Sequence, residues 1–314
     1  MRSLMIAALV FFASPAAAAD EMTIAVFTKN STNPAYEAFR IASDQIARST
    51  GAKIVHFVPN RPDNVDEQKA MVEQVLKDKP DAVIFIPVDD VAMVDSVKKL
   101  NEAKIPVVLV SNPLPGSFVT YVGADDFEIG YREARYLFDK LGAKGKIVVI
   151  EGTPAAPTNR ERVRGYQRAF AEFPGIQVLG SGVGNYQQPD AKRVMAKFLD
   201  EHPQIDAVLS ANDSMALGVL EALKAANRSS IVIGINGILP AVKQIETGAI
   251  LATVDFNMFK IGCTATRAAV RHLRREPLPE KIILPAEVID KTNYKAWLVP
   301  VDQRSCPEWS EVAR

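Results

Sequence analysis

Residues 81–112 read DAVIFIPVDDVAMVDSVKKLNEAKIPVVLVSN and carry the clearest signal of the fold class. Two apolar runs, Ala82–Ile86 and Pro106–Val110, flank a longer segment with helical character that ends near Lys104. Neither run alternates apolar with polar residues, as a strand with one wet face would. Continuous apolar runs are typical of parallel strands that helices cover on both faces. The stretch therefore predicts a strand–helix–strand unit of a parallel sheet.

The same alternation of short apolar runs and longer amphipathic segments continues along the chain. We expect further strands at Thr23–Thr28, Lys53–Val58, Lys146–Ile150, Gln177–Leu179, Ala207–Ser210 and Ile231–Ile235. We expect helices at Pro34–Thr50, Asp66–Asp78, Ser214–Ala226 and Lys260–Arg275. Strand–helix alternation over this length predicts an α/β protein with two parallel sheets.

An internal repeat supports the prediction of two sheets. The segment Asp206–Leu209 resembles Asp81–Ile84 at a distance of 125 residues, and each leads into a helix and a second apolar strand. Ser111-Asn112 follows the second strand of the first copy, and Asn236-Gly237 follows that of the second. Open α/β sheets bind ligands at the carboxyl ends of their strands, where both polar pairs are expected to lie.

The composition excludes several classes of protein. The chain has 314 residues, with 37 Lys and Arg against 37 Asp and Glu, so its formal net charge is zero. A neutral chain offers no positive field to phosphate groups, which argues against a nucleic-acid partner. Hydrophobic residues make up 48% of the chain, enough for a large core, and the length suits two domains.

Residues 1–19 have the features of a secretory signal peptide. Arg2 gives a positive start, Leu4–Phe12 is almost wholly apolar, and Ala17 and Ala19 supply small residues for cleavage before Asp20. The alternative is a membrane anchor, which needs ~20 apolar residues, about twice the length of this run. We therefore expect cleavage after Ala19 and a mature protein outside the cytoplasm.

Residues for catalysis or metal binding do not form recognisable groups. The histidines His56, His202 and His272 stand far apart, and no Cys-x-x-Cys, His-x-x-x-His or Gly-x-Ser-x-Gly motif occurs. Gly180–Gly184 lacks the spacing and the following helix of a dinucleotide-binding loop, so we expect a turn-rich loop there. We expect no cofactor and no metal site.

Cys263 and Cys306 allow two interpretations. In an oxidising compartment they can pair, which would tie the C-terminal tail to the expected helix Lys260–Arg275. Alternatively, Cys263 is a small buried helix residue and Cys306 is a free thiol in the tail. A free exposed thiol outside the cytoplasm is prone to oxidation, which favours the disulfide.

Six segments carry a family resemblance. In chain order they are Thr23–Val26 with Asn33-Pro34-Ala35-Tyr36, Val122–Asp126 with Gly130, Glu151-Gly152 with Asn159–Arg162 and Gly165, Ser210–Gly218, Gly234–Gly237, and Leu251–Asp255. With these segments the chain, from about Thr23 to Ile289, resembles the periplasmic sugar-binding proteins of ABC importers, the ribose/galactose-binding (type I, cluster B) family. LacI-type repressors share this fold, but they begin with a DNA-binding helix-turn-helix where this chain has the signal-like segment.

The resemblance implies two Rossmann-like lobes, each a parallel sheet flanked by helices, joined by a three-strand hinge. We expect crossovers near Gly123–Asp125, Val254–Phe256 and Ala286–Val288, with Asp125 and Asp255 as hinge residues. The first lobe would comprise residues 23–123 and 256–286, the second lobe residues 125–254 and 288–300, and the tail residues 301–314. A ligand that touches both lobes would stabilise the closed form, which a membrane permease reads.

The resemblance also implies ligand-binding residues in both lobes. They are Asn33 and Tyr36 in the first lobe, and Arg160, Tyr186 and Asn212 in the second. Planar polar groups suit vicinal hydroxyls, and aromatic faces suit the C–H patches of a sugar ring. Other roles stay open: Asn33 could cap a helix, Arg160 could pair with a nearby glutamate, and Tyr186 could be an ordinary loop residue.

At four further positions of the implied site the chain departs from the ribose-binding pattern. Ser111 and Asn112 replace an Asp-Arg pair, Asn236 replaces an Asp, and Phe256 replaces a hinge Gln. These changes remove charge-assisted bonds to pentose hydroxyls, so ribose is a poor candidate and Arg160 would be the lone charge. A polyol, cyclitol, deoxy or methylated sugar fits better. The sequence leaves open whether Lys29, Asp89, Asp90 and Asp255 point into the cleft.

The sequence therefore predicts a monomeric periplasmic protein that captures a small neutral carbohydrate or polyol and delivers it to an ABC transporter permease. It would contact the membrane only through membrane proteins. An alternative is a sensor subunit that presents such a ligand to a chemoreceptor or histidine kinase, since both kinds of partner read the closed form. An enzyme on the same fold is disfavoured, because no nucleophile–base pair or metal set appears.

Overall fold

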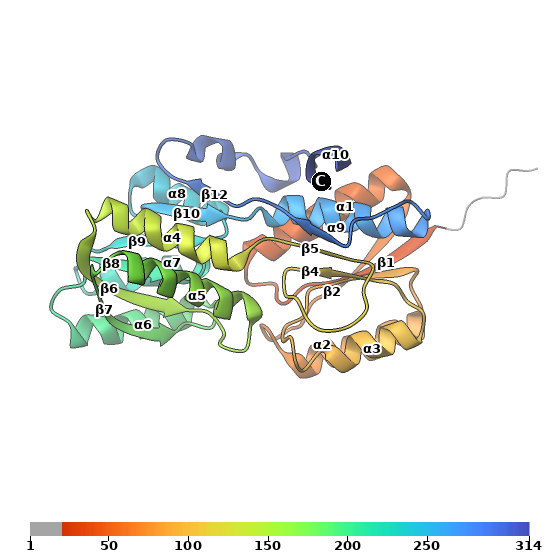
Figure 1. Ribbon diagram of the computed structural model, residues 1–314, viewed down its shortest axis with the longest axis horizontal. Coiled ribbons are helices and arrows are strands. Elements are labelled where there is room, and N and C mark those ends of the chain that lie inside the picture. Colours follow the sequence, from red (N-terminus) through yellow and green to blue (C-terminus); the bar gives the residue numbers. More distant parts are fainter. Residues whose placement is uncertain (1–20, 314) are drawn as a thin grey trace, which may run out of the picture.

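Two α/β lobes lie side by side in the computed structural model, with the C-terminal tail running across both (Figure 1). The structure describes residues 21–313, so the predicted signal peptide lies outside the described residues. Each lobe is built around a six-stranded sheet. Within the described part of the chain, no helix is both long enough and apolar enough to cross a membrane.

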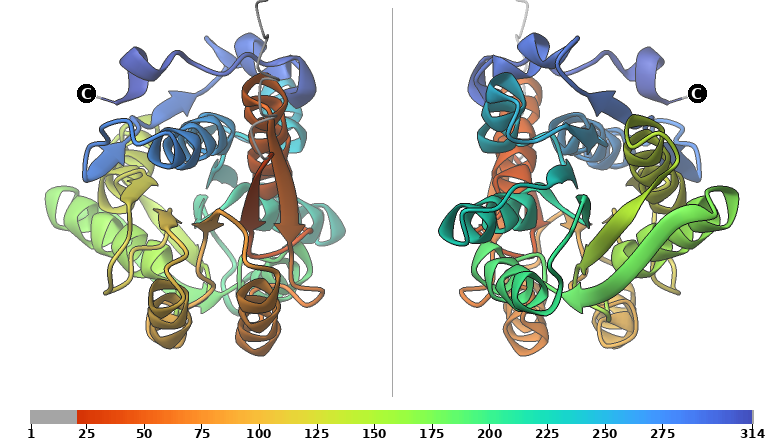
Figure 2. Two further views of the ribbon diagram at one scale, coloured as in Figure 1. Left: turned by 90° about the vertical axis from the view of Figure 1, so that its right-hand side faces the viewer. Right: turned by 90° about the vertical axis from the view of Figure 1, so that its left-hand side faces the viewer.

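The first lobe has a wholly parallel sheet with the strand order β11-β5-β4-β3-β1-β2. Its strands are β1 (Met22–Phe27), β2 (Ala52–Phe57), β3 (Ala82–Phe85), β4 (Val107–Val110), β5 (Thr120–Gly123) and β11 (Lys281–Ile283). Its helices are α1 (Pro34–Thr50), α2 (Val65–Asp78), α3 (Val94–Glu102) and α9 (Met258–Leu273). Helices α1 and α9 pack together over one face, and α2 and α3 cover the other (Figure 2).

The second lobe repeats this arrangement with the strand order β12-β10-β9-β8-β6-β7. Its strands are β6 (Lys144–Glu151), β7 (Gly175–Val183), β8 (Ala207–Ser210), β9 (Ile231–Ile235), β10 (Ala252–Asp255) and β12 (Glu287–Ile289). Its helices are α4 (Asp126–Lys140), α5 (Pro157–Glu172), α6 (Gln188–Glu201), α7 (Asp213–Ala225) and α8 (Leu239–Thr247). Strand β12 runs antiparallel to β10, and the other described strands of this sheet pair in parallel.

Burial on both faces of each sheet explains the continuous apolar runs. In β6, Ile147 and Val149 pack in the cluster that contains α4 and α5, whereas Val148 and Ile150 pack in the cluster that contains α6 and α7. Successive side chains of a strand point to opposite faces, so a strand between two helical layers needs an apolar residue at every position. The stretch 81–112 accordingly folds as β3, α3 and β4.

A pair of aspartates marks the internal repeat in three dimensions. Asp81 precedes β3 and accepts a hydrogen bond from the backbone N–H of Thr23 at 2.7 Å. Asp206 precedes β8 and accepts one from the backbone N–H of Lys146, also at 2.7 Å. Both carboxylates thus join the start of a central strand to its neighbour, at equivalent positions in two sheets of the same order.

The chain passes between the sheets three times, from β5 to α4, from β10 to α9 and from β11 to β12. The predicted fold class, two parallel-sheet lobes joined by a three-strand hinge, is therefore confirmed. After β12 the tail contains η1 (Tyr294–Leu298), η2 (Val301–Gln303) and α10 (Trp309–Val312). A disulfide joins Cys306 of the tail to Cys263 of α9, which resolves the two interpretations of these cysteines.

The prediction of a turn-rich loop at Gly180–Gly184 is wrong, because β7 continues to Val183. The glycines are needed for close packing against α6. A Cβ at Gly182 would lie 2.4 Å from a methyl group of Val194, and one at Gly180 would lie 2.8 Å from the ring of Phe198. A run of glycines therefore marks here a strand that a helix approaches closely.

Candidate functional site

A cavity lies between the two lobes, at the carboxyl ends of the strands in both sheets. Its open volume is about 40 Å³, which corresponds to roughly three ordered waters. Its lining residues are Asn30, Asn33, Ala35, Tyr36, Asp63, Ser111, Asn112, Ala124, Asp126, Thr158, Arg162, Tyr186, Asn212, Asn236, Phe256 and Met258. No group of three or more potential metal ligands occurs among the described residues.

The loop after β1 supplies the first lobe's polar contact. Asn33 caps α1 by accepting a hydrogen bond from the N–H of Ala35 at 2.9 Å, and Asn30 accepts one from the N–H of Asn33 at 3.0 Å. The side-chain oxygen of Asn33 therefore serves the cap, whereas its NH₂ group remains available to the cavity. Burial raises the pKa of Tyr36, so its phenol stays protonated and can donate a hydrogen bond.

A buried ion pair in the first lobe borders the cavity. Lys29, two residues after the end of β1, is only 2% exposed, and its Nζ lies 3.2 Å from Oδ1 of Asp63. The same Nζ lies 5.8 Å from the ring centre of Tyr186, which belongs to the second lobe. The two charges compensate each other at the cavity wall, and Lys29 makes a cation–π contact with Tyr186 of the other lobe.

A second buried ion pair comes from the second lobe. Arg162 in α5 is 3% exposed, and its Nε and Nη2 lie 2.9 Å and 2.8 Å from Oδ1 of Asp126, the first residue of α4. Its Nη1 donates to the carbonyl of Ala211 at 2.7 Å. Burial raises the pKa of Asp126, and the neighbouring guanidinium opposes that shift. The guanidinium also lies over the ring of Phe256, 5.3 Å from its centre.

Two glycines bring Arg162 and Asp126 together. A Cβ at Gly130 of α4 would lie 2.3 Å from the carbonyl oxygen of Arg162, and one at Gly165 of α5 would lie 2.3 Å from that of Phe127. Only glycine permits such an approach, so the two helices cross in backbone contact. The crossing sets the rotation of α5 that turns Arg162 toward the cavity.

Tyr186 and Asn212 form a connected unit in the second lobe. The Nδ2 of Asn212 donates to the carbonyl of Tyr186 at 3.2 Å, while its Oδ1 accepts from the N–H of Met215 and caps α7. Tyr186 has a φ of 59°, unusual for a residue with a side chain. Its hydroxyl lies 3.1 Å from that of Thr158. Tyr186 is therefore a fixed part of the cavity wall, and the cations of Lys29 and Arg162 lie 5.8 Å and 5.9 Å from its ring centre.

The loop after β9 carries Asn236, whose φ is 130°. The fully buried carboxylate of Asp213 holds this loop, accepting a hydrogen bond from the N–H of Ile238 at 3.0 Å and one from the hydroxyl of Thr253 at 2.7 Å. The Oδ1 of Asn236 is buried in the cavity wall and has no hydrogen-bond partner among the described residues. A buried acceptor without a partner is typical of a ligand contact.

The remaining predicted residues have mixed contacts. Asn112 donates to the carbonyl of Pro87 at 2.6 Å, which leaves its side-chain oxygen for the cavity. Ser111 has its hydroxyl 3.7 Å from the sulfur of Met258, and Phe256 adds an apolar wall. The structure therefore gathers around one cavity every predicted ligand residue except Arg160.

The placement of Arg160 in the ligand site is wrong. Its side chain is 47% exposed, lies outside the cavity and forms an ion pair with Asp90 of the first lobe. The cavity instead contains Arg162, which sequence reasoning missed. The helical period is a signal that could have found it, because the buried face of α5 contains Asn159, Arg162 and Tyr166.

The expectation of a site with one lone charge is also wrong. Arg162, Asp126 and Asp63 line the cavity, and Lys29 pairs with Asp63 beside it. The site contains as many carboxylates as cations, arranged as two ion pairs. The sequence offered no signal for the first pair, because Lys29 and Asp63 are brought together only by the packing of separate loops.

The two expected hinge residues lie at crossovers and outside the cavity lining. Asp125 caps α4, accepting from the N–H of Glu128 at 3.0 Å. Asp255 ends β10 and is buried, and its carboxylate accepts from Nε1 of Trp297 at 2.7 Å. Burial raises the pKa of Asp255, and the hydrogen bond from Trp297 opposes that shift.

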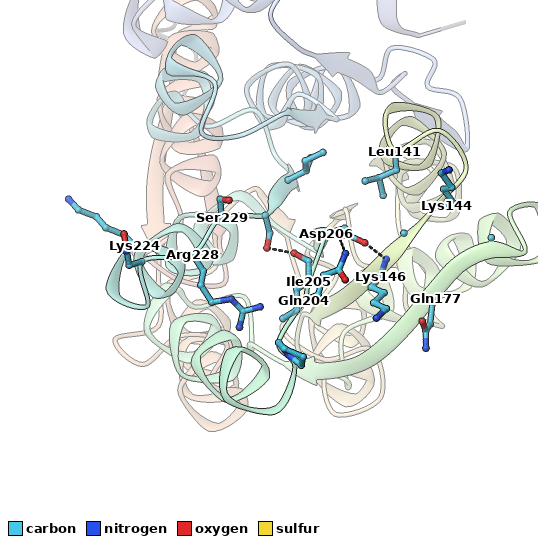
Figure 3. Close-up of a pocket in the computed structure, with 16 residues that line it drawn as sticks. Leu141, Lys144, Lys146, Gln177, Gln204, Ile205, Asp206, Lys224, Arg228 and Ser229 are labelled. Carbon is cyan, nitrogen blue, oxygen red and sulfur yellow. Dashed lines mark hydrogen bonds between the residues drawn. The ribbon is translucent and has the colours of Figure 1, made fainter.

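A second depression lies at the amino-terminal edge of the second sheet (Figure 3). Its open space is about 1420 Å³, and Lys144, Lys224 and Arg228 border it. Asp206 is already committed to the backbone of Lys146, as the dashed line in Figure 3 marks. Ligands of parallel α/β sheets bind at the opposite, carboxyl edge, so the interlobe cavity is the stronger candidate.

Comparisons with known proteins identify the family of this chain. A family model described as a periplasmic binding protein domain matches residues 24–277. The chain is 29% identical over 269 residues to the ribose import binding protein of Bacillus subtilis (strain 168), covering 85% of this chain and 87% of that protein. It is 29% identical over 213 residues to a xylitol-binding protein of Mycolicibacterium smegmatis, covering 67% of this chain and 60% of that protein.

A solved structure is similar as well. It is an ABC transporter periplasmic solute binding protein from Actinobacillus succinogenes 130z with bound D-allose, which matches with a TM-score of 0.83 and 27% identity over 88% of this chain and 100% of that chain. Fold, cavity and sequence therefore agree on one assignment. This chain belongs to the periplasmic binding protein family, as the sequence resemblance indicated.

Proposed function

We propose that this protein is periplasmic and captures one small neutral sugar or polyol in the interlobe cavity. It then delivers the ligand to the membrane permease of an ABC transporter. The single observation that carries this proposal is the cavity itself, which side chains from both lobes line and close. A ligand held there contacts both lobes at once, so its binding energy favours the closed form over the open form. The closed form is then the signal for the permease.

The charges of the cavity support a neutral ligand. Lys29 is compensated by Asp63, and Arg162 is compensated by Asp126. Because both cations are already paired, a charged ligand would bring a further buried charge that has no counterion. Burying an unpaired charge is costly. An uncharged ligand disturbs neither pair.

The remaining hydrogen-bonding capacity supports a hydroxylated ligand. The NH₂ group of Asn33 can donate, and the unpartnered Oδ1 of Asn236 and the side-chain oxygen of Asn112 can accept. A hydroxyl group serves as donor and acceptor at once, so a polyol can satisfy all three. The rings of Tyr186 and Phe256 offer apolar faces for its C–H groups.

Within this class we propose a polyol, a cyclitol, or a deoxy or methylated sugar, and expect ribose to bind more weakly. Ser111, Asn112 and Asn236 stand where the ribose-binding pattern has charged residues, and Phe256 is apolar. The xylitol-binding relative supports a polyol, and the D-allose-bound structure supports a sugar.

Thermal unfolding against a panel of sugars, polyols and cyclitols tests the proposal. A ligand at a hundredfold excess over its Kd adds about 2.7 kcal/mol to the free energy of unfolding. Aldonic acids of matching carbon skeletons serve as controls, and we expect no stabilisation from them. If no neutral member of the panel raises the melting temperature, the assignment of a carbohydrate ligand is wrong.

Partner capture separates the permease from the alternative sensor role. We expect the ligand-loaded protein to bind the permease of its ABC transporter and to stimulate ATP hydrolysis by the reconstituted transporter. Stimulation of a chemoreceptor or histidine kinase instead would favour the sensor.

A further inference from the structure

The C-terminal tail connects the two lobes a fourth time, beyond the three crossovers. We call residues 290–307 the strap. Its first part is anchored to the second lobe: Tyr136 of α4 donates to Asp290 at 2.5 Å, Lys291 donates to the carbonyl of Glu246, and η1 packs against α8. Figure 1 shows the strap crossing from above the second lobe to above the first.

The last part of the strap is anchored to the first lobe. The Nε2 of Gln45 in α1 donates to the carbonyl of Asp302 at 3.1 Å, and Arg267 of α9 donates to that of Pro307. Cys306 is bonded to Cys263, which is fully buried in α9. The disulfide makes this anchor covalent.

The disulfide closes a ring of chain that spans both lobes. From Cys263 the chain runs through β11 in the first lobe, crosses to β12 in the second lobe, and returns along the strap to Cys306. Hinge motion must therefore deform a closed ring, in which the third crossover and the strap are the two links between the lobes.

The middle of the strap lies against the hinge. Trp297 donates its Nε1–H to the buried carboxylate of Asp255, where β10 leads into its crossover. Arg304 in turn donates to the carbonyl of Trp297 at 3.0 Å. The indole is thereby held at the crossover by polar contacts.

Between these contacts, two hollows lie between the strap and the lobes. One has an open space of about 520 Å³ and is bordered by Arg304, and the other has about 530 Å³ and is bordered by Trp297. Asp255 and Asn257 of the crossover line both hollows. The space between the strap and the crossovers, which we call the space behind the hinge, is therefore only partly filled. Trp297 is the bulky side chain of the strap in this space.

The strap and the mouth of the cleft lie on opposite sides of the crossovers. Asp90, which pairs with Arg160 across the mouth, precedes α3, and α2 and α3 lie on the side away from the strap (Figure 1). Rotation about the crossovers that widens the mouth must narrow the space behind the hinge. The hollows allow some narrowing, until the lobes press on Trp297 and the closed ring.

We propose that the disulfide-closed strap is a stop that limits how far the cleft opens. It holds the ligand-free protein near the closed form, so less rearrangement is needed when a ligand binds. Without its covalent anchor the strap lifts away from the crossover, and the lobes open further.

Cys306→Ser tests the proposal without any ligand. Small-angle X-ray scattering measures the radius of gyration, and amide hydrogen exchange measures the opening of peptides that contain Tyr186 and Asn212. We expect a larger radius of gyration and roughly threefold or more faster exchange of those peptides at temperatures well below melting. Ser305→Ala, an exposed neighbour in the strap, is the matched control and should change neither.

A second variant keeps the disulfide intact. Trp297→Phe retains an aromatic ring but loses the hydrogen bond to Asp255, and we expect a change in the same direction and of smaller size. A purely stabilising disulfide would lower the melting temperature of Cys306→Ser and leave its scattering and cleft exchange as in the wild type. That result would overturn the proposal that the strap limits the opening of the cleft.

Discussion

Neighbouring residues on one helix have different roles in this protein. Arg160 and Arg162 both lie in the first turns of α5, yet one pairs with Asp90 at the surface and the other is buried against Asp126. A shift of two positions in a helix turns a side chain by about 200°, so the two arginines point away from each other. Of the two, Arg162 is therefore the one that lines the cavity.

Substitution of the two arginines should separate their roles. Arg162→Ala leaves Asp126 buried without its counterion, and we expect a loss of about 3–5 kcal/mol in the free energy of unfolding. At temperatures where the variant stays folded, ligand binding should weaken at least tenfold. Arg160→Ala removes only the exposed pair with Asp90, so we expect near wild-type denaturant unfolding and, in calorimetric titration, binding at most about fivefold weaker. Equal effects of the two variants would contradict the conclusion that Arg162, and not Arg160, acts in the cavity.

Asp63→Asn should change the preference of the cavity for charge. The substitution leaves Lys29 without its carboxylate, 3.2 Å away in the wild type. We expect the ratio of affinities for an aldonic acid and its neutral counterpart to rise at least tenfold, about 1.4 kcal/mol, as measured by calorimetry. Asp90→Asn, which removes a carboxylate outside the cavity, is the control. An unchanged ratio in Asp63→Asn would refute the charge argument.

Among the elements, the packing of α4 against α5 shapes the second lobe's part of the site. Gly130 and Gly165 allow the close crossing, and Arg162 and Asp126 meet beside it. The same interface buries Glu133 of α4, whose Oε2 accepts from the hydroxyl of Tyr166 in α5 at 2.5 Å. Its Oε1 has no hydrogen-bond partner among the described residues.

The stability of this interface should depend on pH. Burial raises the pKa of Glu133 to about 8, whereas an unfolded glutamate titrates near 4.3. The folded protein therefore binds more protons than the unfolded chain between these values, and its stability falls as the pH rises through that window. The slope contributed by this residue is at most about 1.4 kcal/mol per pH unit.

Glu133→Gln should flatten that dependence, because glutamine does not ionise and still accepts from Tyr166. Denaturant unfolding of wild type and variant at several pH values between 5 and 9 measures the difference. The variant should gain stability relative to the wild type as the pH rises. Glu128→Gln, on the exposed face of α4, is the control and should run parallel to the wild type, and parallel curves for Glu133→Gln would rule out this titration.

At the scale of the whole molecule, contacts between lobes occur at the mouth, in the cavity and behind the hinge. At the mouth Arg160 pairs with Asp90, and Thr32 donates to the side chain of Gln187 at 3.2 Å. These groups belong to different lobes, so opening the cleft breaks both contacts. They favour the closed form, although exposed ion pairs contribute little individually.

Asp90→Asn should accelerate ligand release. Loss of the exposed pair costs the closed form at most about 1 kcal/mol, so the dissociation rate should rise up to roughly fivefold. The effect should shrink at high ionic strength, because salt screens the pair in the wild type. Stopped-flow measurements of dissociation at low and high salt test this. Glu102→Gln breaks an exposed pair with Lys98 away from the mouth and should leave the rate unchanged.

Local patterns predicted the elements of this fold well. The helix Pro34–Thr50 and the strands Ala207–Ser210 and Ile231–Ile235 have the bounds that the sequence indicates. Helix and strand periods arise from backbone geometry over a few residues, so apolar spacing records them directly. The glycines of β7 led to the wrong prediction of a loop, because they are required by the close approach of α6, which no pattern within the strand records.

The sequence by itself determined the two-lobe α/β architecture, the family and most of the residues that surround the cavity, because strand ends in a parallel sheet meet at one edge. Only the tertiary structure decided which arginine enters the cavity, since the rotation of α5 is set by its contact with α4. The tertiary structure also decided that Lys29 meets Asp63 and that the tail is tied across the hinge. These contacts join residues distant in the chain, and no local period encodes them.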